Sequence, residues 1–169
     1  MSLIARLLRP APDPREALRP LWHAVVATAR DPRWYAERGV ADTVEGRFDM
    51  VTLVLAIVLL RLEREGEAPA AARLTEWFVE DMDAQLRQSG VGDLVVGKHV
   101  GKLMATLGGR LGALRDALPG GQAALAEVVA RNVTMSEPAR GPLLADALAA
   151  FHRAVADAPL GALLSGRLP

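Results

Sequence analysis

Residues 46–65 read GRFDMVTLVLAIVLLRLERE, and this stretch decides the fold. Its apolar residues fall on nearly all sides of a helix, and the run is longer than an ordinary β-strand. We therefore predict a buried helix at the centre of the domain. A buried strand is the alternative, because the run is rich in the β-branched residues that strands favour.

The centre of this run, MVTLVLAIVLL at residues 50–60, is the most membrane-like part of the chain. It ends at Arg61 and falls well short of the roughly 20 apolar residues that span a bilayer. The N-terminal stretch MSLIARLLRPAP is interrupted by Arg6 and Arg9, so it lacks the continuous apolar region of a signal peptide. These patterns predict a cytoplasmic protein.

Two helix starts are predicted upstream of the central helix. Residues 13–16, DPRE, combine an Asp N-cap, a Pro at the first helical position and a Glu at the third, so a helix should begin there. Asp31-Pro32 repeats the signal and opens a short helix that Gly39 can end with a left-handed cap. Residues 39–46 are predicted to be a loop.

Downstream, apolar residues recur at helical spacing in four more segments. Residues 67–87 should form an antiparallel hairpin with the central helix through a turn near Gly66, and further helices are predicted over 96–114, around 125–129 and over 144–155. The fold class is therefore predicted to be all-α, a single-domain bundle of about six helices. We divide the chain into an N-terminal segment, 1–13, a helical domain, 14–158, and a loose C-terminal tail, 159–169.

The composition removes several classes of function. Twenty basic residues balance twenty acidic ones, so nothing points to a nucleic-acid partner. Cysteine is absent, which excludes disulfides, thiolate metal sites and a cysteine nucleophile. The three histidines lie in separate segments without ligand spacing, and no nucleophile signature occurs, so we expect no metal, no cofactor and no enzymatic activity.

Residues 90–102, GVGDLVVGKHVGK, contain the G-x-x-x-x-G-K spacing of a phosphate-binding loop. A true loop of this kind follows a strand and continues with Ser or Thr, whereas this one follows a helical pattern and continues with His99. We interpret the glycines structurally: Gly90 caps one helix, Gly92 permits a tight turn, and Asp93 or Gly97 lies near the start of the next helix.

Asp81 lies at the edge of the apolar face of its helix, because it follows Trp77 by four residues and Phe78 by three. A carboxylate buried there needs a partner. Our hypothesis is that Asp81 accepts hydrogen bonds from residues 90–98 or pairs with Arg47; a merely exposed Asp81 is the alternative. Asp83 precedes Arg87 by four residues, the favourable order for a surface ion pair.

Two stretches together resemble one known family: GRFDM at 46–50 and FVEDMDAQLRQSGVGDLVVGKHVGKLM at 78–104. They are similar to the ubiquinol-cytochrome c chaperone family, bacterial relatives of a mitochondrial assembly factor for the cytochrome bc complex. The resemblance spans about residues 20–155. It implies a non-enzymatic protein that binds newly made cytochrome b, or another subunit of that complex, on the cytoplasmic face of the inner membrane, with peripheral contact to the membrane or ribosome.

The matching positions fall into two groups. The charged ones are candidates for a client-binding surface: Arg47, Asp49, Asp83, Arg87, Asp93, Lys98 and Lys102. The others are expected to be structural: Gly46, Phe48, Met50, Phe78, Asp81, Met82, Gly90, Gly92 and Gly97. The alternative for the charged group is a network that fixes the helix hairpin.

Two other functions stay open from the sequence. The bundle could bind a quinone, a lipid or haem in an apolar pocket, which a closed pocket with convergent polar groups would favour. Residues 3–9 could also serve as a short amphipathic membrane anchor. An open apolar groove flanked by the motif charges would favour the chaperone instead.

Overall fold

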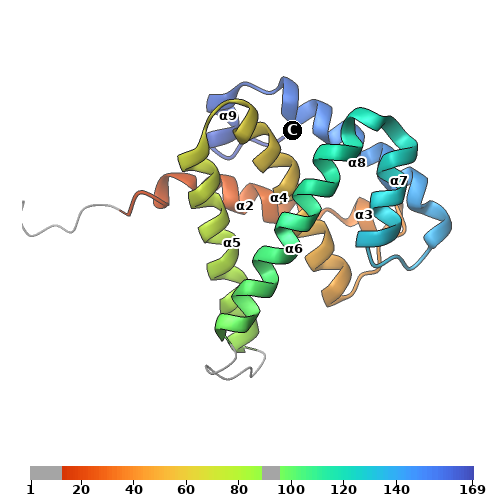
Figure 1. The fold of residues 1–169 in the computed structure, drawn as a ribbon, viewed down its shortest axis with the longest axis horizontal. Helices are drawn as coiled ribbons and strands as arrows, with labels where there is room; N and C mark the ends of the chain where they lie inside the picture. The colour runs from red at the N-terminus through yellow and green to blue at the C-terminus, as the bar shows by residue number, and fades with distance from the viewer. Residues whose placement is uncertain (1–12, 89–95) are drawn as a thin grey trace, which may run out of the picture.

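The computed structural model describes residues 13–88 and 96–169 (Figure 1). Across these residues the protein is helical, with no β-strand, so the predicted all-α class is confirmed. Six helices of more than ten residues build the described part: α2 (Arg19–Ala29), α4 (Val44–Arg64), α5 (Ala68–Gln88), α6 (Val96–Ala117), α7 (Gly121–Asn132) and α8 (Gly141–Asp157).

Helix α4 is the centre of the bundle, as its all-round apolar sequence predicts. It packs against α2, α5, α6 and α8, and every residue from Asp49 to Leu59 is buried. Burial of this many large side chains is the main source of stability for a chain without disulfides. No helix in the described residues is long and apolar enough to cross a membrane.

Helices α5 and α6 cover one side of α4. A turn with Gly66 in the left-handed conformation, at a φ of +74°, returns the chain from α4 into α5. Figure 1 shows α5 and α6 converging at the ends that flank residues 89–95, where they extend beyond the other helices. The predicted helix hairpin of α4 and α5 is thus present, and α6 packs against both.

The C-terminal half of the chain covers the other side of α4. The 3-10 helix η3 (Leu118–Gly120) links α6 to α7, and η4 (Pro138–Arg140) precedes α8, which packs along α7. The expectation of a loose tail is wrong, because residues 160–164 form helix α9 (Leu160–Leu164) against α2. Leu163 is fully buried, and this contact with α2, distant in sequence, orders the tail.

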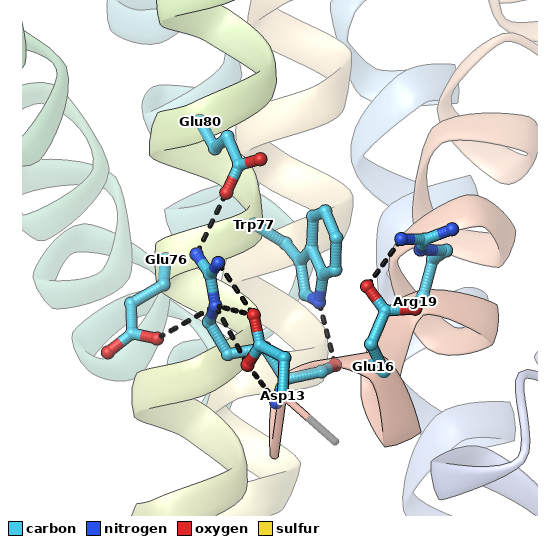
Figure 2. A network of polar contacts seen from close by, with 7 residues as sticks. Asp13, Glu16, Arg19, Glu76, Trp77 and Glu80 are labelled. Atoms are coloured by element: carbon cyan, nitrogen blue, oxygen red, sulfur yellow. Dashed lines mark hydrogen bonds and ion pairs between the residues drawn. The ribbon is translucent and has the colours of Figure 1, made fainter. Parts of the chain in front are cut away.

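The N-terminal helix starts later than predicted. The Asp13 side chain accepts hydrogen bonds from the backbone and guanidinium nitrogens of Arg15, which makes a local turn, and a 3-10 helix η1 (Glu16–Leu18) precedes α2. Short Asp side chains favour such turns over a continuous helix. Figure 2 shows this segment beside α5, where Trp77 donates a hydrogen bond to the Arg15 carbonyl.

Residues 31–43 form the connection into α4. Asp31 caps the short helix α3 (Pro32–Ala36), as predicted, by accepting a hydrogen bond from the backbone N–H of Arg33. Gly39 is left-handed, with a φ of +75°, and Val40 makes an isolated antiparallel bridge to Met135. This bridge brings the segment after α7 to the start of α4.

Candidate functional site

The residues of both motif stretches meet in a groove of about 810 Å³, which we call the central groove. Its apolar lining comes from four helices and consists of Val26, Val44, Phe48, Val51, Met82 and Leu103. Charged residues stand at its edges: Arg30, Glu45, Arg47 and Asp81. Most of these charged side chains are exposed, so the groove opens to solvent.

The start of α4 positions the first motif. Thr43 caps the helix by accepting a hydrogen bond from the backbone N–H of Gly46, and the chain before it folds back over the first turn. An added Cβ at Gly46 would lie 2.0 Å from the carbonyl oxygen of Ala41. Glycine is therefore required at this position for close backbone approach.

The apolar motif residues build the floor beneath the groove. Met50 and Phe78 are fully buried, Met82 is nearly so, and Phe48 is half-buried. The Phe48 and Phe78 rings lie 6.4 Å apart, centroid to centroid, and Trp22 meets Phe78 edge-on at 6.1 Å. Such aromatic contacts lock α2, α4 and α5 together and fix the shape of the groove.

Asp49 does not lie on the surface, contrary to its assignment to an exposed client-binding set. It is 6% exposed and forms a buried ion pair with Arg110 of α6. Its other carboxylate oxygen accepts hydrogen bonds from the backbone N–H and the hydroxyl of Thr134, at 2.7 and 2.8 Å. Both carboxylate oxygens therefore have hydrogen-bond partners inside the molecule, as a buried charge requires.

Arg110 completes this buried network. Its guanidinium also donates to the hydroxyl of Thr52 and, at 3.0 Å, to the carbonyl oxygen of Asn132, and it lies 5.5 Å from the centroid of the Phe48 ring. The pair stands between the central groove and a second hollow of about 480 Å³ on the α7 side. It therefore joins α4, α6 and the segment after α7 behind the groove.

The predicted pairing of Asp81 with Arg47 is wrong. Arg47 is exposed and donates a hydrogen bond to Asp42 at 2.7 Å, and this bond lowers the pKa of Asp42 below its ordinary value. Asp42 is close enough in sequence to reach Arg47 without crossing the groove. Asp81 is half-buried and lines the groove beside Arg30 and Val26.

Three of the remaining charged candidates, Asp83, Arg87 and Lys102, do not line the groove. Asp83 and Arg87 form the predicted pair along α5, at 2.8 Å, and Lys102 is exposed on α6. Lys98 and Gly97 belong to the first turn of α6, which begins at Val96. Gly90, Gly92 and Asp93, and with them the proposed contact of Asp81 to that loop, lie outside the described residues.

Sequence reasoning missed Arg110, although its position carried a signal. It follows the buried Leu107 by three residues and precedes the buried Leu114 by four, so it lies on the apolar face of its helix. A charged residue at such a position must find a buried partner. In the described residues no cluster of histidine and carboxylate side chains is suited to hold a metal ion.

Comparison with known proteins gives two matches. Residues 36–168 match the profile of the family described as Ubiquinol-cytochrome C chaperone. The fold is similar to the crystal structure of the Cbp3 homolog from Brucella abortus, with a TM-score of 0.78 and 29% sequence identity over 90% of this chain and 87% of that one. No curated protein matches the chain significantly. Because the family match covers well over half of the sequence, the chain belongs to the ubiquinol-cytochrome C chaperone family.

Proposed function

We propose that this protein binds newly made cytochrome b, or another subunit of the cytochrome bc complex, in the central groove and releases it unchanged. The observation that carries the proposal is the convergence of the two motif stretches: Phe48 from the first, and Asp81 and Met82 from the second, line one groove. An open apolar groove with charged edges fits a hydrophobic polypeptide segment before it reaches its final partners.

The polar groups behind the groove also support a binding role. Asp49, Arg110 and Thr134 bond to one another and to the backbone. Groups engaged in this way hold helices in place, whereas general acid–base catalysis needs a group free to exchange a proton with a substrate. We assign them to the rigid wall of the groove against which the client lies. The binding itself takes place at the cytoplasmic face of the inner membrane.

Site-specific photo-cross-linking in cells tests the proposal. A photoreactive residue replaces Gln85, which lines the groove, and in a matched control it replaces Gln122, an exposed glutamine on α7. We expect cytochrome b to be captured from position 85 and not from position 122. Capture of a soluble metabolic enzyme from position 85, or equal capture of cytochrome b from both positions, would contradict the proposal.

The size of the groove favours one competing function. A volume of about 810 Å³ lies within the range of small-molecule sites. A quinone, a lipid or haem would then be the occupant. Mass spectrometry and absorbance of the protein purified under native conditions distinguish the two: a stoichiometric apolar molecule that is lost in the Met82→Glu variant would favour this second function.

A further inference from the structure

A hollow of about 640 Å³ lies beside helix α3 and borders the central groove. We call it the α3 hollow. Its apolar lining consists of Pro32, Tyr35, Ala36 and Val40. Arg30, at the end of α2, and Arg47, in the first turn of α4, line both spaces. A chain that passes from the central groove into the α3 hollow therefore runs past these two guanidinium groups.

The α3 hollow carries an excess of positive charge. Its lining includes one carboxylate, that of Asp42, which accepts a hydrogen bond from Arg47 at 2.7 Å. Glu45 and Asp81 line the central groove but not the α3 hollow. The side chain of Arg30 is exposed and has no ion pair within residues 13–88 and 96–169. One guanidinium is therefore available where the two spaces meet.

Arginine side chains hold the C-terminal ends of α3, α7 and α8 in this molecule. Arg140 donates to the last carbonyl oxygens of α3, Arg110 to that of α7, and Arg61 and Arg64 to those of α8, at distances between 3.0 and 3.3 Å. The last carbonyl groups of a helix have no partner within the helix and carry partial negative charge, so a guanidinium is a suitable donor.

Arg30 is not used in this way within its own chain. It follows the last residue of α2, but side chains of α3 already bond the carbonyl groups there: Trp34 donates to the carbonyl of Thr28 at 2.7 Å, and Tyr35 to that of Ala29 at 2.8 Å. The guanidinium of Arg30 is therefore left for carbonyl groups from outside the chain.

The central groove has the size of a short helix that ends at this point. An α-helix about 10 Å across fills roughly 850 Å³ in two turns. The groove has a volume of about 810 Å³, and its apolar lining suits the apolar face of such a helix. The residues that follow the helix would enter the α3 hollow.

From these observations we infer that the client lies in the central groove as an apolar helix, with its C-terminal end at Arg30 and its following residues in the α3 hollow. Arg30 donates hydrogen bonds to the last carbonyl groups of that helix. The opposite direction would place free N–H groups and the positive end of the helix dipole against a guanidinium. The identity of the client rests on the proposed function, whereas the direction of the chain rests on Arg30.

Photo-cross-linking from two positions of the full chain tests this direction. A photoreactive residue replaces Gln85 in the central groove or Ala36, an exposed residue in the α3 hollow, and Ala123, exposed on α7, is the control. We expect cytochrome b to be captured from positions 36 and 85 and not from position 123. Mass spectrometry of the cross-linked peptides should place the client residues captured from position 36 C-terminal to those captured from position 85.

A second measurement tests Arg30 itself. Arg30→Gln should lower the capture of cytochrome b from position 36 severalfold, because the last turn of the client helix loses its donor. Arg30→Lys keeps the charge and should lower the capture less. Arg153→Gln removes an exposed arginine of α8 that lines neither space, and it should leave the capture unchanged. All three variants should keep the melting temperature of the parent, because both arginines are exposed.

The other results overturn the inference. Client residues captured from position 36 that precede those captured from position 85, or unchanged capture in Arg30→Gln, would exclude a helix end at Arg30. Capture of a phospholipid or of a second copy of this chain from position 36, in place of cytochrome b, would assign the α3 hollow to that occupant. If position 85 alone captures cytochrome b, the proposed function stands and the inference fails. If neither position captures it, the proposed function fails and the inference fails with it.

Discussion

At the residue scale, the buried pair of Asp49 and Arg110 has the largest consequences. The two residues are 61 positions apart and are both more than nine-tenths buried, so each is compensated only by the other and by neighbouring hydrogen bonds. Removal of one partner leaves an unpaired charge in the interior, whereas removal of both leaves none. The pair therefore fixes how α4 crosses α6 more than it adds net stability.

The first prediction follows from this asymmetry. Arg110→Met should lower the free energy of unfolding by about 3 kcal/mol, because the carboxylate of Asp49 stays buried without its counter-ion. The double variant Asp49→Asn with Arg110→Met should lower the free energy of unfolding clearly less than Arg110→Met alone does, because it leaves no unpaired charge in the interior. Urea denaturation of the two variants and the parent measures both values. Arg115→Met, which removes an exposed pair with Glu63, is the control and should change stability by less than about 1 kcal/mol.

Two glycines inside helices should respond in opposite ways to alanine. At Gly46 the new Cβ would overlap the Ala41 carbonyl, so Gly46→Ala should destabilise the protein by about 1–3 kcal/mol. At Gly109 nothing lies within 4 Å of a new Cβ, so Gly109→Ala should stabilise it by up to about 1 kcal/mol through helix propensity. The melting temperatures of the two variants and the parent test both expectations. A stabilising Gly46→Ala would show that the start of α4 is loosely packed.

At the element scale, the C-terminal helix shows what a sequence pattern cannot supply. Residues 160–164 are too few to form a stable helix alone, so their helix depends on the contact with α2. Gly166, with a φ of +83°, also lies against the backbone of Pro20. This end of the chain is therefore part of the bundle.

Leu163→Ala should lower the free energy of unfolding by about 2–4 kcal/mol, because Leu163 is fully buried in the core. Leu143→Ala is the control, since that leucine is 46% exposed, and it should change stability by less than about 1 kcal/mol. Chemical denaturation compares the two. Equal effects would mean that α9 adds little to the bundle.

Helix α8 carries a histidine that should make stability depend on pH. Burial, and then the positive charges of Arg64 and Arg153, lower the pKa of His152 below its ordinary value of 6.5. As the pH falls through that value, the unfolded chain takes up a proton before the folded one does, so stability decreases. His152→Gln should lose less stability than the parent between pH 7.5 and 5.5, measured by thermal unfolding.

Above pH 7.5 the histidine is neutral in both the folded and the unfolded protein. The curves of stability against pH for the parent and for His152→Gln should therefore run parallel there. A difference in slope between the two proteins at pH 7.5 to 8.5 would assign the effect to a group other than His152.

At the scale of the whole molecule, the bundle could be predicted from the sequence and the groove could not. The spacing of apolar residues indicated α4, α5, α6 and α8, because each helix buries a face that its own residues define. Asp49 was misplaced because its neighbours in sequence, Arg47 and Phe48, do not reveal that Arg110 meets it across the bundle. Residues such as Val26 and Leu103 line the groove only because α2 and α6 flank α4.

The last prediction concerns the groove as a unit. Val44 is 80% exposed, lines the groove and is the first residue of α4, where the helix dipole favours a glutamate. Val44→Glu should therefore leave the melting temperature unchanged, yet place a charge against an apolar client. A desolvation cost of about 1–2 kcal/mol corresponds to roughly a tenfold loss of cytochrome b recovered with the protein.

Leu143→Glu is the matched control, because Leu143 is also exposed and also lies in the first turn of a helix, α8, outside the groove. Recovery of cytochrome b with each variant, purified from cells at equal protein levels, should fall only for Val44→Glu. An equal fall for both variants would mean that any added negative charge repels the client. A fall for Leu143→Glu alone would move the client-binding surface from the central groove to α8.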